Sequence, residues 1–189
     1  MTGLLTLPDR LLAWVDARIG DVLMPTLARV IFLGVLFLYF WNSAVTKVSD
    51  GFFGIFSPST GAYAQIFPKK AEEVLYDPAM FSAMEKTIII AGTWAEFIFP
   101  VLIVVGLLTR LSALGMIGFV VVQSLTDIFG HGADEKTIGA WFDGPSDAVI
   151  LDQRAFWVFL LVFLVLRGAG PLSLDALLQR GRSPETAPA

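Results

Sequence analysis

Residues 91–127 read AGTWAEFIFPVLIVVGLLTRLSALGMIGFVVVQSLTD, and this stretch decides the fold. It contains two apolar segments joined near residues 108–110, each long enough to cross a hydrocarbon core of about 30 Å. Three polar side chains, Glu96, Gln123 and Asp127, interrupt the apolar sequence. A carboxylate inside a bilayer helix costs roughly 2.5–3.5 kcal/mol on insertion scales. We therefore expect Glu96 to have a partner, a bound proton or a functional role.

The composition is that of a membrane protein. Hydrophobic residues make up 56% of the 189 residues and charged residues 16%, whereas a soluble domain has about 45–50% and about 25%. The chain has no cysteine, which excludes disulfides and thiolate ligands for metals or clusters, and its single histidine excludes a bis-histidine haem site within one chain. The net charge of −4, without a basic run, does not predict nucleic-acid binding.

Hydropathy and helix signals predict an all-α bundle with four transmembrane helices in a single domain, residues 1–178, and a flexible tail, residues 179–189. The expected spans are about 27–45, 87–108, 111–129 and 153–167. Asp77 followed by Pro78 predicts the start of the helix that contains the second span. Gly115 and Gly118 predict close approach of the third span to a neighbouring helix. Ser173 is expected to cap a short helix after the last span.

Two further segments are predicted to lie at the membrane surface or against the bundle. Apolar residues recur on one side of a helix near the N-terminus, from Leu11 to Leu23. This amphipathic helix either lies on the membrane or packs against the bundle, and the pattern favours neither. Residues 46–77 combine prolines and glycines with scattered aromatics, which predicts a connection at the membrane interface or a cap over the bundle.

Four spans place both termini on one side of the membrane. The termini and the hairpin carry Arg10, Arg18, Arg29, Arg110, Arg167, Arg180 and Arg182. The two long loops and their borders carry Lys47, Lys69, Lys70, Lys86, Lys136 and Arg154. The two counts are close, but basic residues in short segments near span ends weigh most. We therefore expect both termini in the cytoplasm and both long loops outside. A bacterial inner membrane is the location implied by the family resemblance given below.

Laid antiparallel, the four helices collect their polar residues in the outer half of the bundle. This set is Asn42, Glu96, Gln123, Asp127, His131 and Arg154. It predicts an outward-facing polar pocket with Glu96 at its floor and Asp127 and His131 nearer its rim. In a second interpretation Asn42, Gln123 and Glu96 only form hydrogen bonds between helices. A third uses Glu96, Asp127 and His131 as carboxylate and imidazole ligands of a metal ion, although their spacing is not specific for one.

The sequence resembles the DoxX family of small bacterial membrane proteins, which includes the DoxD subunits of thiosulfate:quinone oxidoreductases. The resemblance covers nearly the whole chain. It rests on the first span ending at Lys47, on Ala95-Glu96-Phe97 followed by residues 106–114, GLLTRLSAL, and on residues 170–175, GPLSLD. It implies a four-helix membrane bundle associated with redox or stress systems. The two long loops depart from the shorter members of that family.

These observations lead to three functional hypotheses. The first is an accessory subunit of a redox or quinone-linked membrane system, without catalytic activity of its own. In it the pocket around Glu96 binds a small polar ligand or the headgroup of a quinone, and the loops cover the pocket and contact a redox partner protein. The second is metal-ion or small-solute handling at the outer face, with an external metal-handling protein as partner. The third is a structural membrane module that recruits partners through its loops. Membrane lipid surrounds the protein in all three.

Overall fold

The computed structural model of the protein describes residues 6–51 and 53–180, in which the regular elements are helices joined by turns and loops and no strand occurs. Four segments are long and apolar enough to cross a membrane. They are Asp21–Val45, Ala83–Val105, Thr109–Gly130 and Val149–Arg167. The shortest has 19 residues and rises about 28 Å at 1.5 Å per residue. The chain is therefore an all-α, multi-pass membrane bundle, which confirms the fold class expected from the sequence.

The first span starts earlier than hydropathy predicts. Helix α1 (Thr6–Val15) runs through a π-type turn at Asp16–Gly20 into α2 (Asp21–Phe32), and a second π-type turn at Leu33–Phe37 leads into α3 (Leu38–Val45). Pro25 does not begin the span but lies inside α2. Its ring packs where Gly170 passes, since a Cβ on that glycine would lie 2.9 Å from the Cβ of Pro25. Neighbouring segments of this kind make prolines tolerable inside membrane helices.

The second span begins at a capping motif that the sequence analysis missed. Asp77 caps only a 3-10 turn, Pro78–Met80, so the expected start at Pro78 is wrong. The long helix α6 (Ala83–Val105) starts after Ser82, whose hydroxyl accepts a hydrogen bond from the Glu85 N–H at 3.3 Å. Glu85 accepts in return from the Ser82 N–H at 2.8 Å, which completes a capping box.

The turn between the second and third spans lies two residues earlier than predicted, at residues 106–108. Helix α6 ends at Val105, and α7 (Thr109–Leu125) continues through a π-type turn at Thr126–Gly130. Gly106 and Leu108 adopt left-handed backbone conformations, with φ of 72° and 49°. Gly106 is the usual helix-ending residue for this geometry. Residues 109 and 110 therefore form the first turn of α7 rather than the hairpin itself.

The remaining elements are a short helix α8 (Glu135–Ile138), a π-type turn at Val149–Gln153 that begins the fourth span, α9 (Arg154–Arg167) and α10 (Leu174–Arg180). The expected cap at Ser173 is confirmed, because its hydroxyl accepts a hydrogen bond from the Ala176 N–H at 3.2 Å. Helix α10 continues past the predicted start of the tail, residue 179; the rest of that tail, residues 181–189, lies outside the described residues.

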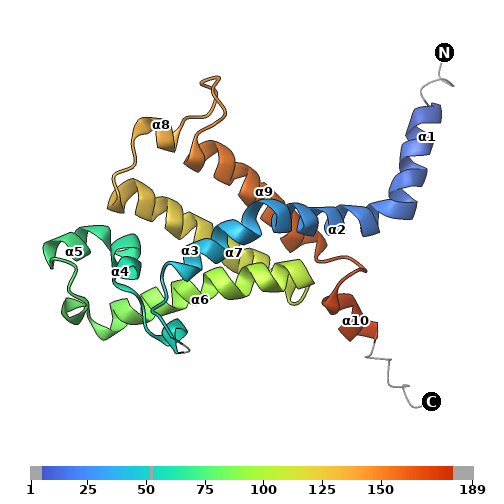
Figure 1. Ribbon diagram of the computed structural model, residues 1–189. Helices are drawn as coiled ribbons and strands as arrows, with labels where there is room; N and C mark the ends of the chain where they lie inside the picture. The colour runs from blue at the N-terminus through green and yellow to red at the C-terminus, as the bar shows by residue number, and fades with distance from the viewer. Residues whose placement is uncertain (1–5, 52, 181–189) are drawn as a thin grey trace, which may run out of the picture.

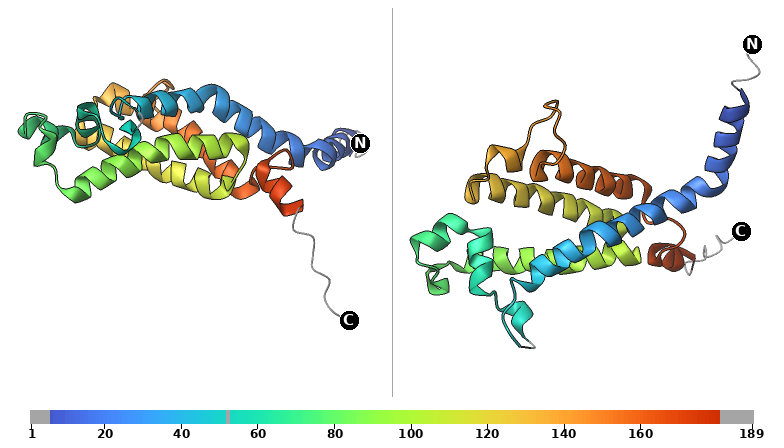
Figure 2. Two further views of the ribbon diagram at one scale, coloured as in Figure 1. Left: turned by 60° about the horizontal axis from the view of Figure 1, so that its bottom comes forward. Right: turned by 45° about the horizontal axis from the view of Figure 1, so that its top comes forward.

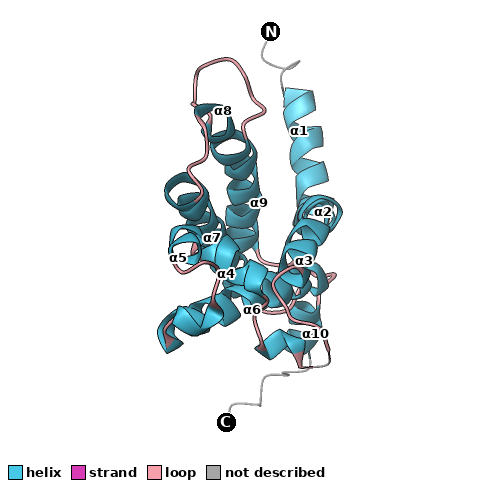
Figure 3. Cartoon of the chain, turned by 60° about the vertical axis from the view of Figure 1, so that its left-hand side comes forward, coloured by secondary structure: helices cyan, strands magenta, loops and turns pink. Residues whose placement is uncertain are grey.

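The helices pack around one apolar core (Figures 1 and 3). Helix α7 lies between α6 and α9, and α2 and α3 cross this layer to contact α6 and α9. The centre is filled by fully buried side chains from all four spans. They include Phe32, Leu36, Phe40, Ile103, Met116, Val120, Leu161 and Leu164. Burying each of them stabilises the bundle mainly through close packing, because lipid tails are as apolar as these side chains.

A second, smaller core covers one end of the bundle. Helices α4 (Thr60–Ile66) and α5 (Pro68–Glu73) pack on the first turns of α6. This core consists of Ala62, Tyr63, Ala71, Phe81 and Ile89. The long connection therefore caps the bundle, which is one of the two arrangements expected from its sequence. Both termini lie at the opposite end (Figure 2).

Helix α1 projects away from the bundle (Figures 1 and 2), and Leu11, Leu12 and Trp14 are more than half exposed. The interpretation in which this helix packs against the bundle is therefore wrong. An exposed apolar face near a span end is the arrangement that a membrane surface stabilises. Its position on that surface stays a prediction.

Only one of the two glycines singled out in the third span lies at a close contact. A Cβ on Gly115 would lie 2.6 Å from Cζ of Phe99, so the α6 ring occupies the space that a side chain would need. A Cβ on Gly118 would meet nothing within 4 Å. Close helix approach is thus confirmed at Gly115 and wrong at Gly118.

Arg29 and Asp175 tie the chain together at the terminal end. The Arg29 guanidinium donates to the carbonyl oxygens of Ile103 at 3.1 Å and Val104 at 2.6 Å, which are among the last of α6, and to those of Ala169 and Leu172 at 3.2 and 2.6 Å. Helix ends leave such carbonyls without partners in the helix. The Asp175 carboxylate in turn accepts from the first N–H groups of the α7 turn.

Candidate functional site: two ionic clusters and an aromatic groove

Glu96 forms a buried ion pair with Lys47. The lysine Nζ lies 2.9 Å from Oε2 and 3.1 Å from Oε1 of Glu96, and the two residues are 5% and 2% exposed. Ser43 completes the cluster: its hydroxyl donates to Glu96 Oε1 at 3.0 Å and accepts from Lys47 Nζ at 2.7 Å. The Ser43 carbonyl oxygen accepts from the same ammonium at 3.1 Å. The partner that Glu96 requires is therefore a lysine, and every polar atom of the pair is bonded.

The local sequence explains how this pair forms. Ser43 and Lys47 are four residues apart, so both face the same side at the end of the first span. Lys47 follows the last residue of α3 by two positions, so Glu96 lies level with the end of that span. The sequence instead predicts Glu96 at the floor of a pocket. The chain then folds over the lysine, with the Ser59 N–H donating to the Lys47 carbonyl oxygen at 2.9 Å.

A second ionic cluster joins the third and fourth spans. Arg154, which is 4% exposed, donates to Asp127 Oδ2 at 2.6 Å and to the Ser124 hydroxyl at 2.9 Å. The guanidinium also lies 5.9 Å from the Trp157 ring, within the range of a cation–π contact. The Asp127 side chain is 31% exposed, so the carboxylate of this pair is more accessible than its guanidinium. Two residues of the predicted pocket, Asp127 and Arg154, are thus brought together.

The other predicted pocket residues have separate surroundings. Gln123 Nε2 donates to the Tyr39 hydroxyl at 2.7 Å. His131 Nε2 lies 3.1 Å from the Gln65 carbonyl oxygen and so joins the loop to α4. Asn42 is exposed, and its side chain makes no hydrogen bond within the described part of the chain.

In the part of the chain that the structure describes, no hydrogen bond or ion pair joins Glu96 to the Asp127 cluster. Within residues 6–51 and 53–180, no group of three or more histidine and acidic side chains is close enough to hold a metal ion. Glu96, Asp127 and His131 instead have three different partners: Lys47, Arg154 and a backbone carbonyl. The structure therefore does not assemble the metal-ligand set considered from the sequence, and the two ionic clusters behave as interhelical links.

An apolar groove lies next to the Glu96 cluster, on the outer side of α3 and α6. Its volume is about 620 Å³ and its walls are almost entirely apolar. They are formed by Trp41, Ile55, Phe56, Trp94, Phe97, Ile98, Val101 and Leu102. The Phe97 ring meets Trp41 edge to face at 4.9 Å, and Phe56 meets Trp94 at 5.3 Å. Such contacts hold aromatic walls in fixed orientations.

One short segment connects the groove to the ion pair. The 3-10 turn Gly54–Phe56 is fixed to α6 by a hydrogen bond from Trp94 Nε1 to the Ile55 carbonyl oxygen at 2.7 Å. Ile55 lines the groove and also a narrow void over Lys47. The same turn therefore separates the aromatic walls from the buried ammonium. Sequence reasoning missed both the lysine and this groove, although Trp94 and Phe97 lie within two residues of Glu96 in the sequence.

Comparison of the chain with protein-family models, with curated proteins and with solved structures found no match. The resemblance to the DoxX family thus stays a hypothesis. Two of the stretches that carry it are in contact: the Asp175 N–H donates to the Gly106 carbonyl oxygen at 2.8 Å.

Proposed function

We propose that the protein is an accessory subunit of a redox or quinone-linked membrane system and that it binds the ring of a quinone in the aromatic groove. The observation that supports this is the groove itself, with a volume of about 620 Å³ and a lining that includes two tryptophans and two phenylalanines. This volume lies within the range of small-molecule sites, about 300–1,000 Å³. A quinone reaches such a site from the bilayer, where its tail remains.

Polar groups near the groove match the chemistry of a quinone headgroup. Its carbonyl oxygens require hydrogen-bond donors. The Trp94 indole N–H in the groove wall donates to the Ile55 carbonyl oxygen, so it becomes a donor for a ligand only when the turn that carries Ile55 moves. The Lys47 ammonium lies behind Ile55, so a displacement of that turn would add a charged donor. Glu96 keeps the ammonium neutralised while the turn is closed. The chain has no cysteine and one histidine, so electrons pass through the quinone and a redox partner protein in this proposal.

The proposal is tested by titrating the purified protein in lipid nanodiscs with a short-chain quinone, using calorimetry. We expect saturable binding that weakens at least tenfold in Phe97→Ala, because that ring forms one wall of the groove. The matched control is Phe156→Ala, which removes an exposed ring from α9 on a different surface. Equal affinities for the two variants, or no saturable binding by the unaltered protein, would refute the proposal.

We also propose that the protein lies in a bacterial inner membrane with both termini in the cytoplasm. The support is the concentration of arginines at the end of the bundle that carries the termini. Basic residues in short segments near span ends favour the cytoplasmic side of the membrane. Reporter domains fused to the C-terminus test this orientation. If a reporter domain that is active only outside the cytoplasm is active in this fusion, the C-terminus lies outside. The groove and both long loops would then face the opposite side from the one proposed.

A further inference from the structure

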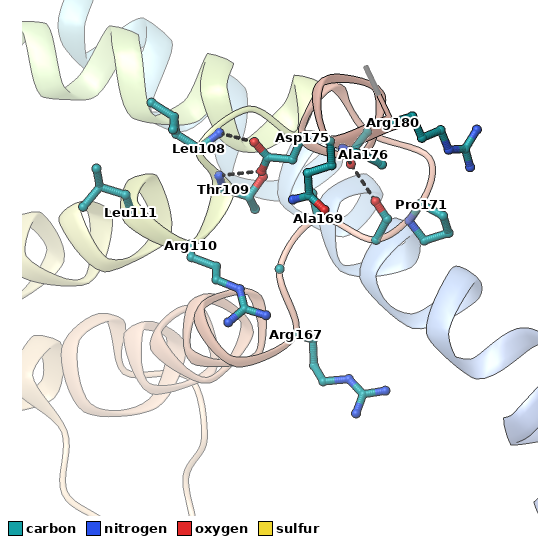
Figure 4. Close-up of a pocket in the computed structure, with 14 residues that line it drawn as sticks. Leu108, Thr109, Arg110, Leu111, Arg167, Ala169, Pro171, Asp175, Ala176 and Arg180 are labelled. Carbon is teal, nitrogen blue, oxygen red and sulfur yellow. Dashed lines mark hydrogen bonds between the residues drawn. The ribbon is translucent and has the colours of Figure 1, made fainter. Parts of the chain in front are cut away.

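The loop between α8 and the fourth span, residues 139–148, projects sideways from the bundle (Figures 1 and 3). At the end that carries the termini, by contrast, the chain is held against the bundle. There Asp175 accepts hydrogen bonds from the N–H groups of Leu108 and Thr109 at 2.8 and 3.1 Å, which fix α10 to the start of α7 (Figure 4). The quinone proposal makes no use of the projecting loop, so the inference below is independent of it.

Two large apolar side chains occupy neighbouring positions in this loop. Phe142 is fully exposed, and Trp141 is 63% exposed. The backbone of Phe142 is left-handed, with φ of 69°, a conformation that residues with a side chain rarely adopt. Burying an aromatic ring of this size is favourable, and the described part of the chain does not bury it. The ring is therefore available to a surface outside the molecule.

One hydrogen bond fixes the depth of the loop relative to the membrane. The Trp141 indole Nε1 donates to the Leu151 carbonyl oxygen at 2.9 Å, and Leu151 belongs to the first turn of the fourth span, Val149–Arg167. Trp141 is thus level with the end of that span. Tryptophan is enriched at this level, where its ring meets acyl chains and its N–H remains among polar groups. Phe142 follows directly, about 3.8 Å along the chain, so it lies near the same level.

The loop adjoins a surface that lipid covers. Leu151, whose carbonyl oxygen holds Trp141, is 37% exposed, and Phe156 further along the same span is 71% exposed. The charges of the loop limit how far it can enter the membrane. Asp143 follows Phe142 directly and is exposed. A carboxylate is costly in hydrocarbon, so the backbone of the loop stops among the headgroups while the ring reaches the acyl chains.

We propose that Phe142 inserts into the leaflet next to the long loops and, together with Trp141, anchors residues 139–148 to the membrane surface. The occupant of this apolar surface is lipid, because the loop extends sideways from the bundle at the level of a span end (Figure 1). Since Trp141 is bonded to the first turn of the fourth span, the anchor also holds that end of the span at a constant depth.

The absence of cysteine allows a single nitroxide label at any chosen position of the full chain. Labels on Phe142→Cys, on Phe156→Cys in α9 and on Lys136→Cys in α8 are compared in liposomes. Relaxation by oxygen, which concentrates in lipid, is measured against relaxation by a water-soluble nickel complex. We expect the oxygen-to-nickel ratio at position 142 to be about threefold higher than at position 136 and to approach that at position 156, as for a side chain at the interface. Equal ratios at 142 and 136 would overturn the proposal and leave a protein as the partner of the ring.

A second measurement keeps the ring in place. A label on Ala140→Cys, which is also exposed in the loop, is read with Phe142 present and in Phe142→Asn. Asparagine tolerates the left-handed backbone, so this substitution removes the ring and retains the turn. We expect the ratio at position 140 to fall about threefold when the ring is lost. The label at position 156 in the same background confirms that the span is still inserted. An unchanged ratio at 140 would mean that the ring is not an anchor, which would also overturn the proposal.

Discussion

Replacing Glu96 by glutamine should destabilise the bundle strongly. The substitution keeps the side-chain shape but removes the charge that faces Lys47, leaving a buried ammonium with only neutral acceptors, namely the two Ser43 oxygens and one amide oxygen. At about 3 Å and an effective dielectric constant of about 20, the lost attraction is roughly 5–6 kcal/mol. Part of it is offset by the gain from not desolvating a carboxylate. We expect the free energy of unfolding to fall by about 3–5 kcal/mol, the usual cost of breaking one half of a buried pair.

The assay is reversible unfolding in mixed micelles at increasing mole fraction of sodium dodecyl sulfate, followed by circular dichroism. The matched control is Asp21→Asn, which removes the carboxylate of the exposed pair with Arg167. Exposed pairs contribute about 0–1 kcal/mol, so this variant should remain close to the unaltered protein. Both carboxylates belong to membrane helices and differ mainly in burial, which isolates the effect of desolvation.

A double variant decides whether the pair itself is responsible. Glu96→Gln combined with Lys47→Met removes both charges, and we expect it to recover about 2–3 kcal/mol relative to the sum of the single losses. Two outcomes would refute this reasoning. One is a loss below about 1 kcal/mol for Glu96→Gln, as small as that of an exposed pair. The other is additivity of the two substitutions, which would mean that Glu96 and Lys47 act independently.

Three further predictions use the same unfolding measurement. Arg154→Met should lower the free energy of unfolding by about 2–4 kcal/mol, since it leaves a partly buried carboxylate without its partner. A loss as small as that of an exposed ion pair would show that Asp127 does not need a cationic partner. Asp175→Ala should cost about 1–2 kcal/mol, because two N–H groups at the start of α7 lose their acceptor, and an unchanged midpoint would contradict this. Gly115→Ala should destabilise by about 1–3 kcal/mol through contact with Phe99, whereas Gly118→Ala should be neutral or stabilising; equal effects would disprove the packing described here.

The sequence was sufficient for the spans because hydropathy depends only on the solvent that each segment meets. Boundaries were less predictable. Helix α6 begins after its cap residue, Ser82, where the reciprocal hydrogen bonds with Glu85 form. Asp77 and Pro78 start only a single 3-10 turn. Both motifs are legitimate helix starts, and only the packing of α5 and Phe81 onto α6 selects between them.

The candidate site was predictable only in part. The need of Glu96 for a partner followed from the cost of burying a carboxylate, and Arg154 was expected near Asp127. The identity of the first partner was not predictable, because it depends on the rotation of α3 about its axis and on how far α6 extends beyond it. Lys47 was counted as a loop cation, yet its position one turn after Ser43 was a usable signal.

The Arg29 contacts impose an order on biosynthesis. The guanidinium is inserted with the first span, but two of its acceptors, the carbonyls of Ala169 and Leu172, are translated 140 and 143 residues later. Until then the cation can use only the end of α6. The first of the four spans thus gains two of its Arg29 hydrogen bonds only after the fourth span has been translated.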